Sequence, residues 1–237
     1  MSEPSPPSLW SVELDALPVA APLAVDDLLL VPTGVPAVSP QHAVLHALDL
    51  ADGALRWRKR FEHGLVSGLA RIAGGLTLVG LTSLHLTHGT GRLVGLDEAG
   101  EVHFCWAPEA DLAVQRVSGP AVAGDLACLT ADARTFVVLD LRTGAERVRV
   151  DLGAEAKAPL SAPAVADGVA YVPCKGPHLF AVGLDGQVRW RFAAEGDPDV
   201  WMEKTPLVVE GRVFAVLTSG ALLVLRAEDG SPVGRVG

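Results

Sequence analysis

The stretch that decides the fold reads Ala47-Leu48-Asp49-Leu50-Ala51-Asp52-Gly53-Ala54-Leu55-Arg56-Trp57. An apolar run leads into an Asp, a polar turn ends at a Gly, and a second short run follows with Trp as its anchor. Glycine accepts the positive φ that tight turns require. The stretch therefore predicts two antiparallel strands joined by a turn.

The same pattern returns four more times along the chain. Its turn glycines are Gly53, Gly100, Gly144, Gly186 and Gly230, at steps of 47, 44, 42 and 44 residues. Upstream of each turn lies an apolar run interrupted by a polar pair, which is typical of a second hairpin. Each period therefore predicts four short strands, and four-stranded units at this spacing are typical of propeller blades.

We therefore expect an all-β protein, a β-propeller of about five four-stranded antiparallel blades. A polar tail is expected over residues 1–8 and a single propeller over residues 9–237, with repeats at about 15–62, 63–110, 111–153, 154–196 and 197–237. Trp10 precedes Trp57 by one period of 47 residues, so its segment resembles an outer strand without a blade of its own. Such a strand closes the ring if it completes the last blade. The alternative is a partial propeller completed by another chain or by further sequence.

The repeat resembles the PQQ-like, or quinoprotein-type, β-propeller repeat, whose tryptophan-docking motif is A-x-D-x-x-T-G-x-x-x-W. The first copy has Asp52 for Thr, the third has Val148 for Trp, and the last has Arg226 for Asp and Gly234 for Trp. The resemblance implies a set of structural docking residues, which we place at Trp10, Asp49, Gly53, Trp57, Trp106, Asp140, Gly144 and Trp190.

The resemblance also brings a cofactor into question. Quinoprotein enzymes of this family bind PQQ over a central Trp, with calcium held by Glu, Asn and Asp and often a disulfide of adjacent cysteines. This sequence has no Asn and no adjacent cysteines. His103 and Cys105 share a strand face, but two ligands do not make a zinc site. We therefore expect no cofactor, no metal and no catalytic residue, with a PQQ-dependent enzyme as the less favoured alternative.

Departures from the repeat indicate where a partner binds, because loops tolerate changes that strands do not. The decorated loops of the first, second and last repeats are expected on one face of the propeller. Their candidate interaction residues are His42, His85, His88, Asp197, Asp199, Trp201, Met202, Glu203 and Lys204. Apolar residues in a polar loop are enriched at interface centres, but Trp201 is equally explained by packing over a blade edge.

A second candidate is a cationic rim at one mouth of the central channel. Arg116, Lys157 and Lys204 lie in connectors before the innermost strands, next to small residues such as Ser67-Gly68 and Ser118-Gly119. A rim of this kind would receive an acidic peptide or a carboxylate. The alternative is that the charges are ordinary solvated loop residues and that the small residues relieve crowding near the axis.

Net charge and cysteine content indicate which classes of partner and which compartment are expected. The formal net charge of −9 disfavours nucleic-acid binding and an anionic membrane surface, and the apolar runs are too short for membrane insertion. Cys105, Cys128 and Cys174 are odd in number and are expected to be buried thiols of a reducing compartment. With no recognisable secretory signal at the N-terminus, we expect a cytoplasmic protein.

The sequence thus favours a non-enzymatic scaffold that mediates protein–protein interaction within a larger cytoplasmic assembly. The scaffold propeller of outer-membrane assembly shares this repeat, although the missing signal argues against that role here. The alternative of a different class is a propeller that binds a small ligand or glycan.

Overall fold

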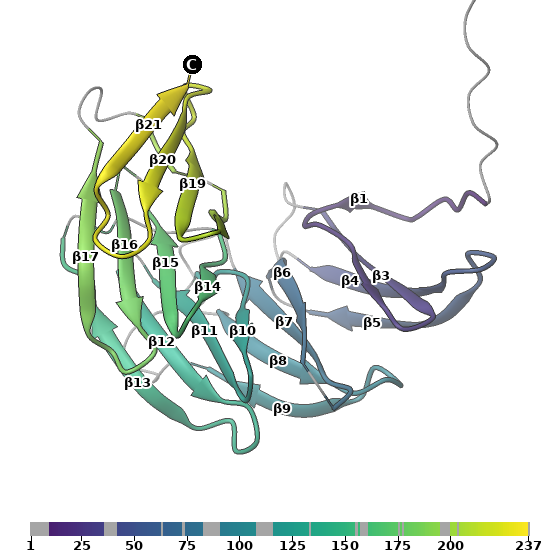
Figure 1. Cartoon of the computed structure of the whole chain (residues 1–237). Coiled ribbons are helices and arrows are strands. Elements are labelled where there is room, and N and C mark those ends of the chain that lie inside the picture. The colour runs from purple at the N-terminus through teal and green to yellow at the C-terminus, as the bar shows by residue number, and fades with distance from the viewer. Residues whose placement is uncertain are drawn as a thin grey trace, which may run out of the picture.

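The computed structural model describes residues 10–35, 42–62, 64–72, 74–82, 91–107, 116–132, 134–154, 156, 161–174, 176, 178–194, 200–202 and 204–236. Over these residues the chain forms five antiparallel sheets that follow one another as the blades of a propeller (Figure 1). The predicted all-β propeller of four-stranded blades is therefore confirmed.

Each blade is built from consecutive strands, beginning with the innermost. Blade one comprises β2 (Leu23–Val25), β3 (Leu28–Gly34), β4 (Ala43–Asp49) and β5 (Leu55–Phe61), with β1 (Leu17–Pro18) paired to β3. Blade two comprises β6 (Leu65–Arg71), β7 (Thr77–Thr82), β8 (Arg92–Leu96) and β9 (Val102–Trp106). Blade three comprises β10 (Ala121–Ala123), β11 (Leu126–Ala131), β12 (Thr135–Asp140) and β13 (Glu146–Asp151).

Two further blades complete the array. Blade four comprises β14 (Ala164–Ala166), β15 (Val169–Pro173), β16 (His178–Gly183) and β17 (Val188–Ala193). Blade five comprises β18 (Leu207–Val209), β19 (Arg212–Val216), β20 (Leu222–Arg226) and β21 (Pro232–Val236). In every blade the register of the outer hairpin shifts at the same place, just before the turn, as at Ala47/Leu48 in blade one.

The motif Asp shapes the outer turn by accepting backbone hydrogen bonds. Asp49 accepts from the amide of Ala51 at 2.8 Å, and Asp140 accepts from the amides of Arg142 and Thr143 at 2.9 and 3.1 Å. Arg147 also donates to the Asp140 carboxylate. These donors, led by Arg147, lower the pKa of Asp140 to about 2. The Asp therefore stays ionised and fixes the turn on which the next contact is built.

Successive blades are joined by a docking contact that repeats around the array. The residue four positions after each turn glycine packs on the turn glycine of the following blade. A Cβ at Gly100 would lie 2.8 Å from the Trp57 ring, whose indole N–H donates to Glu98 O at 2.9 Å. Val148 packs on Gly186 and Trp190 on Gly230 in the same way. The predicted docking roles of Trp57 and Trp190 match these contacts.

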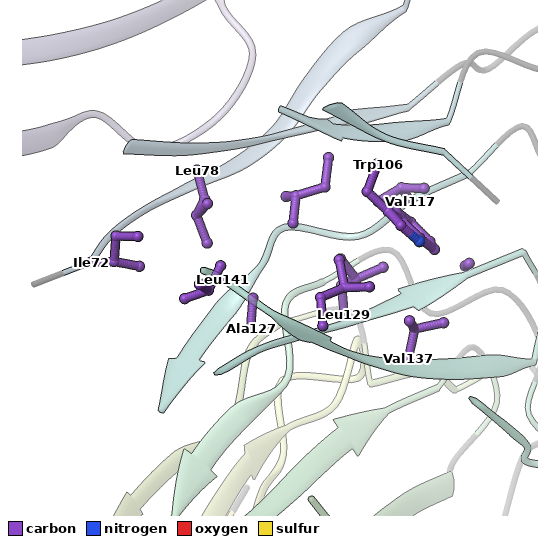
Figure 2. Packing of buried hydrophobic residues seen from close by; sticks show 11 residues of the cluster. Ile72, Leu78, Trp106, Val117, Ala127, Leu129, Val137 and Leu141 are labelled. Carbon is purple, nitrogen blue, oxygen red and sulfur yellow. The ribbon is translucent and has the colours of Figure 1, made fainter. Parts of the chain in front are cut away.

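Trp106 requires a correction. The docking residue of blade two is Phe104, which lies against Gly144, because Phe104 and not Trp106 stands four residues after Gly100. Trp106 is 8% exposed and belongs to the apolar core between blades two and three, together with Leu78, Leu129 and Val137 (Figure 2). Trp106 thus joins the same two blades through their core and not through the turn.

The small residues near the axis relieve crowding, as one of the two interpretations expected. A Cβ at Gly68 would lie 2.8 Å from Gly119 Cα, and a Cβ at Gly119 would lie 3.3 Å from the Cβ of Ala162. Backbones of neighbouring blades therefore approach closely here, and a larger residue at Gly68 would push them apart.

The blades form an open arc, and in the described residues the N-terminal segment does not close it by completing blade five. Figure 1 shows blade five well separated from blade one. Trp10 packs on Gly53 of blade one, and its indole N–H donates to Leu50 O at 3.0 Å. Blade five has an outer strand of its own, β21. The N-terminal segment thus supplies the docking residue for blade one and adds no strand to blade five.

Candidate interaction surfaces

The loop predicted as an interaction surface is only partly described. Asp197, Asp199, Glu203, His85 and His88 lie outside the described residues. Met202 was expected on the surface, and this expectation is wrong: it is 2% exposed and packs in the core between blades four and five. Trp201 is half-buried, and its amide donates to the Thr218 hydroxyl at 3.0 Å. The segment around Trp201 therefore packs against blade five.

The predicted cationic rim stays a prediction. Arg116 lies just before blade three, where its carbonyl accepts from the amide of Asp132 at 2.8 Å. Lys204 is exposed just before blade five. Lys157 lies outside the described residues.

The outer face of blade five is an uncovered apolar sheet face. Its apolar residues, which point away from blade four, are Leu207, Val209, Phe214, Val216, Leu222 and Val224. Leu207 is 63% exposed, and Val209 and Val216 are also exposed. In a closed array such residues would be covered by the next blade.

The outer face of blade five has the same strand positions as the face with which blade four packs on its neighbour. By strand register, Phe214 occupies the position of Tyr171, and Leu222 that of Leu179. Tyr171 and Leu179 are buried against blade five. The outer face of blade five therefore repeats, at the end of the arc, the face with which blade four contacts its neighbour.

Two features distinguish this face from that of blade four. Gly234 stands in the docking position, and no atom of the described residues lies within 4 Å of where its Cβ would be. Arg212 and Arg226 face each other across β19 and β20, where blade four has Val169 and Gly183. Like charges directly opposite one another in a sheet are unfavourable. Among the described residues, neither Arg has a carboxylate within ion-pairing distance.

The open face of blade one, at the other end of the arc, is partly covered and polar. Residues of the N-terminal segment lie over it and form a pocket of about 390 Å³ with the sheet. The polar residues that line this pocket are Asp15, Thr33, His42, His46, Arg58 and Arg60. His46 and Arg58 are cross-strand partners on β4 and β5. Of the predicted interaction residues, the structure thus brings His42 into a pocket.

Thr33 and His46 form a hydrogen-bonded pair at the floor of the pocket. Both are buried, and Thr33 Oγ1 lies 3.1 Å from His46 Nε2. Because the Thr33 hydroxyl donates its one proton to Val44 O at 3.3 Å, it accepts from His46 Nε2–H. Burial, the largest influence, lowers the pKa of His46, while Asp15 raises it and Arg58 lowers it.

The other blades lack these polar residues. The positions that correspond to His46 by strand register hold Val94, Val137, Phe180 and Leu223. Those that correspond to Thr33 hold Leu81, Ala131, Cys174 and Leu217. The polar floor is therefore a departure from the repeat confined to blade one.

A family model described as outer membrane protein assembly factor BamB matches residues 105–235, which is more than half of the chain. The chain belongs to this PQQ-like family. The docking contacts described above extend the same repeat to blade one and the first part of blade two, which lie outside the matched residues. No curated protein matches the chain in sequence.

Solved structures support the PQQ-like fold at low identity. BamB from Moraxella catarrhalis matches with a TM-score of 0.70 and 16% identity, over 95% of this chain and 62% of that one. The quinohemoprotein alcohol dehydrogenase from Pseudomonas putida HK5 matches with a TM-score of 0.71 and 17% identity, over 96% and 43%. A europium-containing methanol dehydrogenase matches with a TM-score of 0.71 and 16% identity, over 95% and 52%. The chain spans less than two thirds of each of these structures.

The PQQ-like family contains enzymes, so the fit of a quinone site has to be tested on the residues. Within the part of the chain that the structure describes, no group of three or more His, Cys, Asp or Glu side chains is placed to hold a metal ion. His103 and Cys105 are both exposed on β9, on the outside of blade two. The described residues do not supply the donors that a metal-bound quinone needs, and we derive no redox step.

The cysteines are free thiols in the described structure. Burial raises the pKa of Cys128 and Cys174 to about 12, so both remain protonated and unreactive. Cys105 was expected to be buried, and this expectation is wrong, because it is exposed on β9. No helix in the described residues is long and apolar enough to cross a lipid bilayer.

Proposed function

We propose that this PQQ-like chain is a non-enzymatic scaffold that binds another protein through the outer face of blade five. The observation that carries the proposal is that the apolar centre of this face, Phe214 and Leu222, stands at the positions of Tyr171 and Leu179, with which blade four packs on blade five. Exposed apolar sheet faces of this kind mark interaction sites. The assembly factor described by the matching family supports a role among protein partners.

The chemistry of the face specifies the partner. The partner presents a β-sheet with an apolar centre that can pack on Phe214 and Leu222. The partner supplies the aromatic docking side chain, because Gly234 leaves the docking position of blade five empty. It carries an acidic group opposite Arg212 and Arg226, because two facing guanidinium groups need a neutralising charge on burial.

The blade-one end of a second copy is a poorer fit for this face. There, Thr33, His46 and Arg58 replace the apolar residues on which a blade packs, and the N-terminal segment covers part of the sheet. We therefore assign the face to a different protein and treat self-association and a further blade of the same chain as the competing outcomes.

The compartment of this assembly is proposed to be the cytoplasm, because three free cysteines suit a reducing environment. The family description names an outer-membrane assembly factor, so fractionation of the native cells is the direct test. Recovery of the chain in the cytosolic fraction supports the proposal, and recovery in the envelope fraction contradicts it.

The docking proposal is tested by site-specific crosslinking in native cells. A photo-crosslinking phenylalanine replaces Phe214, and the captured protein is identified by mass spectrometry. The expected result is one partner, crosslinked through a β-strand, that is lost with Leu222→Glu and kept with Leu55→Glu. Leu55 is the matched control because it is an exposed leucine on the outer strand of blade one.

Three results would contradict the proposal. The crosslink captures a second copy of the chain, the partner survives Leu222→Glu, or position 214 captures nothing. The first result reassigns the face to self-association, and the others remove it as a docking site.

A further inference from the structure

We infer that the pocket on the open face of blade one is a binding site for a small carboxylate. This inference concerns the opposite end of the arc and does not depend on the scaffold function proposed for blade five. It rests on the shape of the pocket, on the charges that line it, and on the departure of blade one from the repeat.

The pocket has the dimensions of a small-ligand site. Its volume is about 390 Å³, within the range typical of ligand pockets. One wall is the sheet of blade one and another is the N-terminal segment at Asp15 and Ala16. Trp10 holds that segment on the blade-one turn through its contacts with Leu50 and Gly53.

Two guanidinium groups lie on one side of the pocket. Arg58 and Arg60 are two residues apart on β5, so they share one face of the strand and stand about 7 Å apart along it. Arg60 also forms an ion pair with Glu62 at 3.2 Å. Among the described residues, no carboxylate lies within ion-pairing distance of Arg58. Arg58 is therefore the cation available to a ligand.

The balance of charge favours a monoanion. The lining holds two arginines against one carboxylate, Asp15, in a chain whose formal net charge is −9. Arginine binds carboxylates and phosphates through paired N–H donors. The Arg60–Glu62 ion pair and Asp15 offset much of the positive charge of the two arginines, so the pocket suits one negative charge better than the two of a phosphate dianion. The Asp15 carboxylate opposes a second negative charge from the same ligand.

The floor of the pocket supplies polar contacts and no charge. Thr33 and His46 hydrogen-bond to each other, and the tautomer assigned above leaves His46 Nδ1 as an acceptor. Such a floor suits a ligand that carries a hydroxyl or amino group beside its carboxylate. Packing between blades does not explain these residues, because the same positions in the other blades are apolar.

The test measures binding of acetate, lactate and inorganic phosphate by calorimetry with the purified full chain. We expect lactate to bind more tightly than acetate, since its hydroxyl can reach the polar floor, and phosphate to bind least. Arg58→Gln is expected to weaken lactate binding about tenfold or more, as loss of a charged hydrogen bond does. Arg191→Gln is the matched control, because Arg191 holds the same strand position in blade four, and it should leave binding unchanged.

A second variant tests the pocket without disturbing the fold. His46→Val installs the residue that blade two has at this position, so it should keep the sheet intact while removing the polar floor. We expect it to abolish the preference for lactate over acetate and to keep the wild-type far-ultraviolet circular dichroism.

Several results would overturn the inference. Neither carboxylate binds at about 10 mM, a concentration well above that expected for a specific site. Arg58→Gln binds as wild type does, or phosphate binds more tightly than both carboxylates. The last result would assign the pocket to a phosphate group.

Discussion

The two end faces of the arc have the same strand framework and opposite chemistry. On blade five the outer face is apolar and uncovered, with Phe214 and Leu222 at its centre. On blade one the open face has Thr33 and His46 at its centre, and the N-terminal segment lies over it. Repeat arrays need a terminal unit whose outer surface suits water. The N-terminal segment covers part of the open face of blade one, whereas none of the described residues covers the outer face of blade five.

The difference lies in a few side chains, because the backbone of the two blades is alike. Trp10 supplies the docking contact that blade one would otherwise receive from a preceding blade. Gly234 removes the contact that blade five would otherwise donate. Whether a propeller blade packs on a neighbouring blade therefore depends on its docking residue and on the residues at the two central positions of its face.

The largest expected effect is a difference in the free energy of unfolding between variants of Leu179 and Leu222, which occupy equivalent positions in blades four and five. Leu179→Ala should lower the free energy of unfolding by about 2–5 kcal/mol, because Leu179 is fully buried between two blades. Leu222→Ala should lower the free energy of unfolding by less than about 1 kcal/mol in the isolated chain, because none of the described residues covers that face. Chemical denaturation of both variants measures the difference. Equal losses would mean that blade five is covered in solution, either because the arc closes or because another copy packs on it.

A smaller effect is expected from Trp10→Ala. The indole packs on Gly53 and donates to Leu50 O, but it belongs to a short segment and not to a complete blade, so we expect a loss of about 2 kcal/mol in the free energy of unfolding. Trp57→Ala is the control, because Trp57 makes the same contact between two complete blades. Its loss should reach about 3 kcal/mol. Hydrogen exchange should show faster exchange on β3 and β4 with Trp10→Ala alone. Unchanged exchange there would mean that the N-terminal segment does not protect blade one.

The repeat made the fold predictable from sequence, since turn glycines and polar pairs recur with one period. The position of single residues was less secure. Trp106 drew attention because it is a Trp, yet counting four residues from Gly100 selects Phe104. Met202 was assigned to a surface because polar residues surround it, although a methionine next to a blade can fill its core.

The pocket on blade one was missed for a different reason. His42 was predicted as part of an exposed loop, whereas the structure places His42 and His46 in the lining of one pocket. Comparison of the five repeats position by position shows His46 and Thr33 as polar exceptions. Asp15, Arg58 and Arg60 join them only through the fold, because the path of the N-terminal segment does not follow from the repeat.

The smallest expected effect is the pH dependence that His46 gives to blade one. Burial holds the pKa of folded His46 below its usual value near 6.5, so the unfolded chain takes up a proton at a pH where the folded chain does not. The stabilising contribution is therefore fully present above about pH 6.5 and declines as the pH falls below it. Between pH 7 and 5.5 we expect a loss of less than about 1 kcal/mol.

Denaturation of wild type and His46→Val across this pH range measures the effect. The difference in unfolding free energy between the two proteins should change with pH, because the other six histidines are common to both. Leu223, the equivalent position in blade five, cannot titrate, so the pH effect should appear in the hydrogen exchange of blade one and be absent from that of blade five. A pH-independent difference would mean that His46 is as accessible to protons as in the unfolded chain. Blade one would then lack the buried polar floor that distinguishes it from blade five.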